Sequence, residues 1–307
     1  MIAGLLGAAM VAQTIRMAVP YVCAGIGGVW SERSGVVNIA LEGILLAGGL
    51  AGVAGHLATG SASAGLLAGA AMGAILGAIH AVLVVYGGVD AIVSGLAINL
   101  AAAGGTRFVL RALYASSSNS PSIAGFPVAV GGASDAALLL RTALDPTTLL
   151  TAALVAWSAW SLAQTRLGLR VRACGESPPA AASAGVDVKR VRLAAVTLGG
   201  AIAGLGGVAL AYDQHRFQSG MSGGRGFIAL AAVILSGWRP ALAAAACVAF
   251  AALDAAQILV QQQTGSAASF APMLPYVATL VALWLVAKRR ATRRGTGRAP
   301  AALGREL

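Results

Sequence analysis

Long apolar runs follow one another along nearly the whole 307-residue chain, and short polar stretches separate them. A transmembrane helix needs about 20 apolar residues, and roughly 17–25 are tolerated. By this measure the chain holds about 8–10 spans, which predicts an all-α, polytopic transmembrane helix bundle. The expected spans are 3–27, 40–58, 62–86, 91–110, 147–165, 193–212, 226–237, 241–261 and 272–287.

Two segments do not fit a pattern of complete crossings. The run 226–237 is short for a full span, and the stretch 31–43 is too short and too polar to form one. We expect both to be half-helices or the ends of interrupted helices. Interruptions in corresponding halves of a chain are typical of transporters that contain an internal repeat.

The composition favours a membrane protein. The chain is 58% hydrophobic and 10% charged, with a mean hydropathy of +0.82, whereas a soluble domain carries about a quarter charged residues. A large soluble core is the alternative, but the apolar runs repeat along nearly the whole length. The 41 glycines suit a closely packed bundle, because small residues let transmembrane helices approach each other.

The net charge of +11 is concentrated in two places, since residues 166–192 carry six basic residues and residues 288–305 carry seven. Both clusters flank apolar spans, which is the pattern of cytoplasmic segments and argues against a nucleic-acid site. We therefore expect a transmembrane domain over 1–287 with a cytoplasmic loop at 166–192, and a basic cytoplasmic tail over 288–307. The loop 111–146 is then outside, and the side of the N-terminus stays open.

No catalytic or metal-binding pattern is visible in the sequence. Cys23, Cys174 and Cys247 are scattered without ligand spacing. There is no phosphate-binding loop of the G-x-x-x-x-G-K-[ST] type, and no Ser/His/Asp or paired-carboxylate arrangement. We therefore expect that the chain is not an enzyme and binds no cofactor or metal, and that any energy for its work comes from another chain.

The stretch SERSGVVNIALEG (31–43) carries charges near membrane depth, where they are expensive. Asn38 and Glu42 are four positions apart and would share one face of a helix, and Gly35 and Gly43 permit turns. A broken helix that lines a solute path explains these residues, because polar groups at this depth need protein or a water-filled cavity around them. A cytoplasmic interfacial loop with mutually paired charges explains them about equally well.

The basic loop RLGLRVRACGESPPAAASAGVDVKRVR (166–192) contains a second candidate element. Pro178 and Pro179 suit the first turn of a helix, and Gly185 suits its C-terminal cap. The small-residue helix between them could dock into the groove of a partner. An ordinary basic loop is the alternative.

The segment SGGRGFIALAAVILSGWRP (222–240) is the third candidate. Gly223, Gly224 and Gly226 precede its short apolar run. It forms the second interruption, matched to 31–43, and two such interruptions point to a solute-binding site in a transporter with repeats. An ordinary, poorly hydrophobic span is the alternative.

Together the three segments resemble the permease subunits of ATP-binding-cassette importers, in the group that includes branched-chain amino-acid and simple-sugar permeases. ERSGVVNIALEG is similar to E-R-S-G-V-V-N-I-G-L-E-G of the nucleoside and simple-sugar branch, with Ala40 in place of a glycine. RACGESPPAAASAGV is similar to the cytoplasmic loop R-A-x-G-E-x-P-x-A-A-x-x-A-G-I, with Cys174 and Val186 as mild departures. The third segment is similar to G-x-G-F-x-x-I-A-V-A-x-x-G-x-x-x-P. The resemblance covers about residues 20–287.

This resemblance implies a pore of two permease chains, identical or homologous, in the bacterial cytoplasmic membrane. Two separate ATPase subunits would bind ATP and dock on the cytoplasmic coupling loops, and a periplasmic or lipid-anchored binding protein would deliver the solute. The implied coupling residues are Arg172, Gly175, Glu176, Pro178, Ala180, Ala181 and Gly185. The implied path residues are Gly35, Asn38, Glu42, Gly224, Gly226 and Phe227.

The branch implies nucleosides as the solute, with a simple sugar as the alternative. An ion-coupled secondary transporter is a further alternative, and it would need a carboxylate inside the membrane. Asp254 is well inside a predicted span, whereas Asp90 and Asp213 lie near span ends. An intramembrane enzyme is the last alternative, and it lacks any visible catalytic constellation.

Overall fold

The computed structural model describes residues 7–128, 132, 134–263, 273, 275–281, 284, 288 and 299–304. Within these residues the regular elements are helices, apart from one isolated bridge between Asn119 and Gln218. The helices are α2 (Ala8–Arg33), α3 (Leu41–Thr59), α4 (Ala62–Ala81) with the π-helical turn η1 (Val82–Tyr86), α5 (Ala91–Tyr114), α6 (Asp135–Ala143), α7 (Pro146–Gln164), α8 (Arg166–Glu176), α9 (Pro178–Ser183), α10 (Val188–Asp213), α11 (Arg225–Leu235) and α12 (Pro240–Gln263).

The helices confirm an all-α, polytopic bundle. In the described part of the chain, six helices are long and apolar enough to cross a membrane. A seventh span results if α6 and α7, which meet at a bend of 55°, are counted as one. The helix α11 has only 11 residues, as the short run 226–237 predicts. Most of the expected span 272–287 lies outside the described residues.

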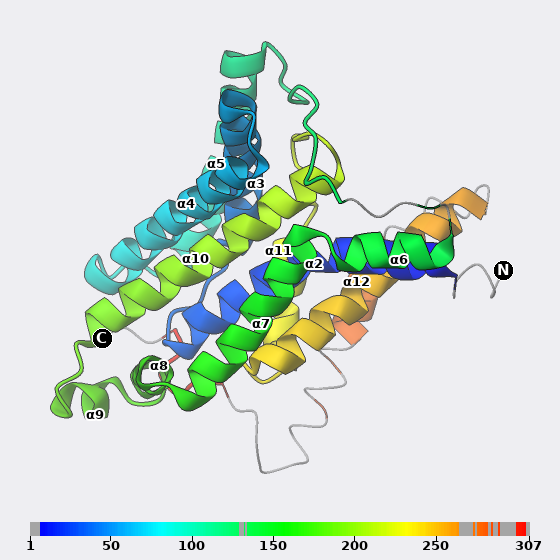
Figure 1. The fold of residues 1–307 in the computed structure, drawn as a ribbon. Helices are drawn as coiled ribbons and strands as arrows, with labels where there is room; N and C mark the ends of the chain where they lie inside the picture. Colours follow the sequence, from blue (N-terminus) through cyan, green and yellow to red (C-terminus); the bar gives the residue numbers. More distant parts are fainter. Residues whose placement is uncertain are drawn as a thin grey trace.

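The helix α10 runs through the middle of the bundle and packs against α2, α3 and α4 (Figure 1). The contact with α4 is made by glycines one turn apart, because the buried positions of α4 are Gly65, Gly69, Gly73 and Gly77, followed by the last two residues of the helix. A Cβ atom at Gly73 would lie 2.2 Å from the Gly200 carbonyl oxygen. The backbones of α4 and α10 are therefore so close that no side chain fits between them at this point. Small residues pack membrane helices in this way.

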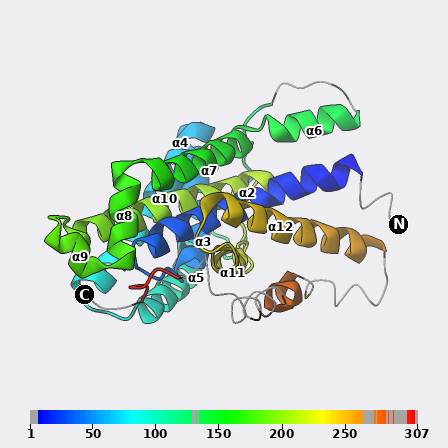
Figure 2. The same ribbon diagram turned by 90° about the horizontal axis from the view of Figure 1, so that it is seen from below.

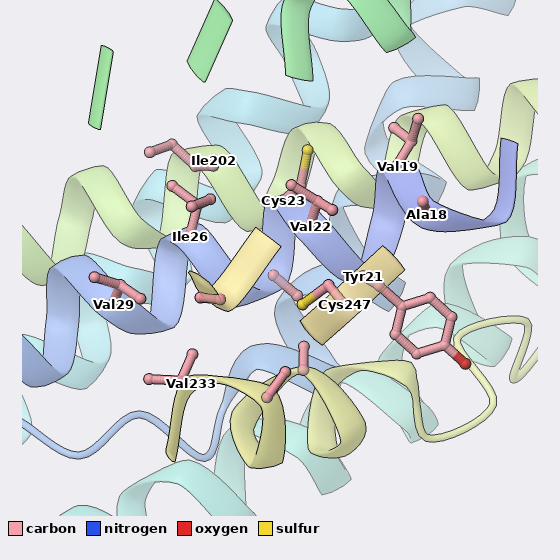
Figure 3. Close-up of a cluster of buried hydrophobic side chains, with 14 of the residues drawn as sticks. Ala18, Val19, Tyr21, Val22, Cys23, Ile26, Val29, Ile202, Val233 and Cys247 are labelled. Atoms are coloured by element: carbon pink, nitrogen blue, oxygen red, sulfur yellow. The ribbon is translucent and has the colours of Figure 1, made fainter. Parts of the chain in front are cut away.

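The helix α2 is the second buried element, and it lies beside α12 in two views (Figures 1 and 2). Its apolar side chains meet those of α10, α11 and α12 in the main hydrophobic cluster. Figure 3 shows part of this cluster, with Ile26 and Val29 of α2, Ile202 of α10, Val233 of α11 and Cys247 of α12. The short helix α11 is thus held on the long helix α2 by apolar contacts.

The structure differs from the expectations at three places. The helix α2 continues to Arg33, so the interruption is confined to Ser34–Ala40 and Asn38 does not share a helix with Glu42. The start of the basic loop is helical (α8), and the outer loop contains α6. Both helices are short, and the sequences around them contain residues that are typical of loops, so they were not predicted. The predicted small-residue helix is confirmed as α9, followed by Gly185 at φ +79°.

Candidate functional site

The first part of the site is the non-helical break Ser34–Ala40 between α2 and α3. Asn38 is fully buried, its Nδ2 donates to Ser31 Oγ at 3.0 Å, and its Oδ1 accepts from the Ala40 N–H at 3.2 Å. Neighbouring helices supply partners for the exposed backbone: His80 Nε2 is 2.9 Å from the Val37 carbonyl, and Asn99 Nδ2 donates to the Ile39 carbonyl at 2.9 Å. The backbone polar groups of a helix break inside a membrane bundle need such partners, because no water is present there to form hydrogen bonds with them.

The second part is the contact between the first turn of α3, directly after the break, and the start of α11. Both Glu42 carboxylate oxygens accept backbone hydrogen bonds, one from Gly224 N–H and one from Gly226 N–H, each at 2.8 Å. The first N–H groups of a helix have no partner within the helix, and its N-terminus favours negative charge. Glu42 therefore caps the short helix from another element, 182 or more positions away in the sequence.

Glycine is required where the two elements meet. A Cβ atom at Gly226 would lie 2.5 Å from the Glu42 backbone nitrogen and 2.6 Å from its Cα. Gly224 has φ +82° at the N-cap position of α11, a conformation that glycine adopts without a steric cost. The two glycines thus allow the start of α11 to approach the first turn of α3.

The length of α11 separates this contact from the end of α2. The 11 residues of α11 span about 16 Å at 1.5 Å per residue, roughly half the thickness of a 30 Å hydrocarbon layer. Beyond its far end, Trp238 meets the end of α2, because its carbonyl accepts from Arg33 Nε at 2.8 Å and its indole N–H donates to Glu32. The Glu42 contact and the end of α2 therefore lie near opposite ends of a helix that is too short to cross the hydrocarbon layer.

An ion pair with a buried aspartate fixes Arg225, the partly buried first residue of α11. Arg225 Nη2 is 3.1 Å from Asp254 Oδ2 of α12. Tyr21 of α2 donates to the same oxygen at 3.2 Å, and Gln257 donates to the other carboxylate oxygen at 2.6 Å. Asp254 therefore acts as the counter-ion of Arg225 in this arrangement, which accounts for its charge inside a span.

The structure brings together some of the predicted path residues and separates others. Glu42, Gly224 and Gly226 meet at one point, and the neighbouring Phe227 side chain is 44% exposed. Gly35 lies at the opposite end of the break. Asn38 is buried and its amide is used by the break itself. Among the predicted path residues, Phe227 at the start of α11 is the exposed one.

The basic loop 166–192 forms the third part of the site, and it touches the break directly. A Cβ atom at Gly175, near the end of α8, would lie 2.2 Å from the Arg33 carbonyl oxygen. Glu176 Oε1 is 3.9 Å from Arg33 Nη1. The buried Arg192 of α10 donates from Nε to the Ser34 carbonyl at 3.0 Å and from Nη2 to the Cys174 carbonyl at 3.4 Å. Arg192 thereby joins α8 to the first residue of the break.

The helix α9 presents a small-residue surface. Pro179, Ala180 and Ala182 are exposed, whereas Ala181 is buried against Cys174 and Val188. Pro178 at the start of α9 is half-buried and Gly185 after its end is exposed, whereas the half-buried Arg172 of α8 lines a separate pocket with Arg33 and Trp238. Burial raises the pKa of the Cys174 thiol, which fits a structural cysteine rather than a reactive one.

Sequence reasoning missed the residues that connect these parts. His80 and Asn99 are polar residues within mostly apolar stretches of α4 and α5, and Arg192 is one of three basic residues at the start of α10. A polar side chain at membrane depth signals a buried partner, so His80 and Asn99 were visible as candidates. Arg192 was counted only as one charge of the basic loop.

Comparison with known proteins gives matches along nearly the whole chain. The family described as branched-chain amino acid transport system / permease component matches residues 2–283. The nucleoside ABC transporter permease protein NupC of Lactococcus lactis subsp. cremoris (strain MG1363) is 33% identical over 296 residues, which are 90% of this chain and 91% of the relative. The guanosine ABC transporter permease protein NupQ of Bacillus subtilis (strain 168) is 35% identical over 288 residues, which are 89% of this chain and 90% of the relative.

A more distant relative is the glucose ABC transporter permease protein TsgB13 of Haloferax volcanii. It is 28% identical over 242 residues, which are 73% of this chain and 62% of the relative. No solved structure matches the chain. The relatives agree in being ABC transporter permeases, and they differ in the solute that their names give.

Proposed function

The chain belongs to the branched-chain amino acid transport system / permease component family, and we propose that it forms one half of the membrane pore of an ABC importer. A second permease chain, homologous or identical, completes the pore. Separate ATPase subunits bind and hydrolyse ATP, and a periplasmic or lipid-anchored binding protein delivers the solute. The chain itself carries out no chemistry.

The proposed solute is a nucleoside. Two relatives that this chain matches over about nine-tenths of its length are named for nucleoside and guanosine transport. A simple sugar is the second candidate, because another relative is named for glucose. The importer mechanism is the same for both solutes, so the two candidates differ only in the molecule that is transported.

The observation that carries the proposal is the direct packing of the basic loop on the break. Gly175 sits against the Arg33 carbonyl, and Arg192 holds the Ser34 and Cys174 carbonyls. A force applied to α8 and α9 by an ATPase therefore reaches the first residue of the break without an intervening element. We assign ATPase docking to the loop that contains Gly175 and Glu176.

The other end of the break reaches the proposed path. The seven residues Ser34–Ala40 lead to Glu42, which caps the start of the short helix α11. A displacement of the break would move Glu42 relative to Gly224 and Gly226, and would open or close the start of α11. This coupling of loop, break and half-helix is the proposed basis of alternating access.

The basic loop and the described C-terminal segment lie at the same end of the bundle (Figure 2), since the Ala302 N–H donates to the Gly175 carbonyl. The positive-inside rule assigns this end to the cytoplasm. We therefore place the C-terminus in the cytoplasm and the chain in the bacterial inner membrane.

Proteoliposomes that hold this permease, its ATPase and its binding protein test the proposal. We expect ATP-dependent uptake of labelled guanosine or adenosine that requires all components. Accumulation of glucose instead would keep the importer mechanism and replace the solute. Uptake without the ATPase, driven by a proton or sodium gradient, would replace the mechanism with the ion-coupled alternative.

A further inference from the structure

A pocket of about 490 Å³ lies where the ends of α2 and α7 and the middle of α8 meet the start of α12. The helix α7 contacts both α8 and α12, at the end of the bundle that carries the basic loop (Figure 1). Three arginines line this arginine pocket, and no carboxylate is among its described lining residues. The lining residues are Arg33, Ala159, Leu162, Ala163, Arg172, Trp238, Arg239, Pro240, Ala241 and Leu242.

The three arginines carry like charges that the described residues neutralise only in part. Arg172 and Arg239 are close enough to repel Arg33. In the described part of the chain, the one carboxylate within 4 Å of these guanidinium groups is the exposed Glu176, 3.9 Å from Arg33 Nη1. Arg172 Nε is buried and has no hydrogen-bond partner among these residues. The pocket therefore holds positive charge that a bound anion would neutralise.

A second carboxylate nearby, Glu32, does not supply the missing negative charge. Its side chain is buried and accepts the indole N–H of Trp238, and it is not part of the pocket lining. Even if Glu32 and Glu176 are both set against the three arginines, one positive charge remains. The charge of the pocket thus selects an anionic ligand.

The rest of the lining is apolar, and it selects the kind of anion. The last turns of α7 and the first turn of α12 contribute alanine, leucine and proline side chains. Leu242 on the α12 side is 49% exposed, and Trp160 in the same part of α7 is 58% exposed. Tryptophan is enriched where the hydrocarbon layer meets the lipid headgroups. A charged side and an apolar side at the ends of membrane helices match a lipid headgroup with its acyl chains.

We propose that the arginine pocket binds an anionic phospholipid. The guanidinium groups of Arg172 and Arg239 hold the phosphate, and the acyl chains lie against α7 and α12. Guanidinium groups form strong, charge-assisted hydrogen bonds with phosphate oxygens. The proposed function enters only in placing this end of the bundle on the cytoplasmic side, so lipid binding can be measured without transport.

A phosphate in the pocket would also stabilise the joint between three elements. Arg33 holds the Trp238 carbonyl beyond the far end of α11, while Arg172 belongs to α8 and Arg239 to the turn before α12. The phosphate reduces the repulsion between these arginines. We therefore expect the bound lipid to raise the melting temperature of the permease, as a ligand of the folded state does.

The test uses the full permease, purified in detergent, with native mass spectrometry to compare dioleoylphosphatidylglycerol and dioleoylphosphatidylcholine. We expect the parent to bind the anionic lipid at least about tenfold more tightly, because each basic residue near an anionic lipid adds severalfold to the affinity. The double variant Arg172→Gln/Arg239→Gln should lose this preference. The matched control Arg166→Gln/Arg170→Gln removes two exposed charges of α8 that lie outside the pocket, and it should keep the preference.

Thermal melting gives a second readout and shows whether each variant is folded. Phosphatidylglycerol should raise the melting temperature of the parent and of the control, but not that of the double variant. If the double variant does not fold, Arg239→Gln alone, at an exposed position, should show part of the loss.

Equal binding of the two lipids by the parent, or an equal loss of preference in the control, would overturn the proposal. Displacement of phosphatidylglycerol by inorganic phosphate would mean that the pocket binds free phosphate, and the lipid assignment would be wrong. Absence of ATP-dependent uptake, with the lipid preference intact, would overturn the proposed function alone, so the two failures are distinguishable.

Discussion

Removal of the Glu42 carboxylate is the most direct test of the arrangement at the centre of the bundle. Glu42→Ala deletes both acceptors of the Gly224 and Gly226 N–H groups. Glu42→Gln keeps one acceptor oxygen and loses the charge. If Glu42 holds the start of α11 in place, the alanine variant should be damaged more than the glutamine variant.

The expected magnitude follows from the two bonds. A hydrogen bond to a charged group contributes about 1.5–3 kcal/mol, so their sum has an upper limit of about 3–6 kcal/mol. Glu42 is partly exposed, and water can replace part of this interaction. We therefore expect the free energy of unfolding to fall by about 2–3 kcal/mol for Glu42→Ala and by about 1–2 kcal/mol for Glu42→Gln.

The three free cysteines provide the assay, because Cys23, Cys174 and Cys247 are all buried. A dye that fluoresces on reaction with thiols reports their exposure as the permease is heated. At about 2 °C per kcal/mol for a chain of this size, the melting temperature should fall by about 4–6 °C for Glu42→Ala and by about 2–4 °C for Glu42→Gln. Asp135→Ala, on the exposed start of α6, is the control. A melting temperature of Glu42→Ala equal to that of the parent would refute the capping argument.

Three further predictions concern the other contacts. Gly175→Ala places a Cβ atom against the Arg33 carbonyl, and overpacking that costs about 1–3 kcal/mol should lower ATP-driven uptake severalfold. The control Gly104→Ala, which has open space around it, should leave uptake unchanged. If the Gly175 variant takes up solute as fast as the parent, the contact between Gly175 and Arg33 does not couple the loop to transport. Asp254→Ala removes the counter-ion of the partly buried Arg225. We expect the free energy of unfolding, followed by thermal melting, to fall by about 3 kcal/mol, the lower end of the range for breaking a buried pair, with Asp254→Asn less damaging. A variant that melts normally but loses a dependence on an ion gradient would instead identify an ion site. Cys174 should react with maleimide at least about tenfold more slowly in the folded protein than after unfolding, because burial raises the pKa of its thiol. Mass spectrometry measures the extent of labelling. Rapid labelling in the folded protein would mean that α8 is not packed as described.

Apolar run length predicted most of the fold. The expected spans 40–58, 91–110 and 147–165 coincide with α3, α5 and α7 to within a few residues, because a run of about 20 apolar residues has few other uses in a chain of this composition. The helices α6 and α8 were missed, since helices of 9 and 11 residues are too short to contain such a run.

Only part of the contact between α3 and α11 could be predicted from the sequence. Glu42, Gly224 and Gly226 were each identified as unusual residues, but the bonds between them join positions at least 182 apart in the chain. A one-dimensional pattern shows an unpaired carboxylate and a glycine-rich helix start separately. The rule that the first N–H groups of a helix need acceptors, strict at membrane depth, connects the two.

The break itself is the element whose stiffness decides whether coupling is possible. An unsupported stretch of seven residues would absorb a displacement of α8 by bending, and Glu42 would not move. In this chain the stretch is held along its length, by Arg192 at the Ser34 carbonyl, by His80 at the Val37 carbonyl and by Asn99 at the Ile39 carbonyl. Each anchor comes from a different helix, α10, α4 and α5. Under the proposed function we therefore expect a displacement at Gly175 to reach Glu42 as a shift of these helices. On that view, the residues that hold the break would matter for transport as much as those that line the path.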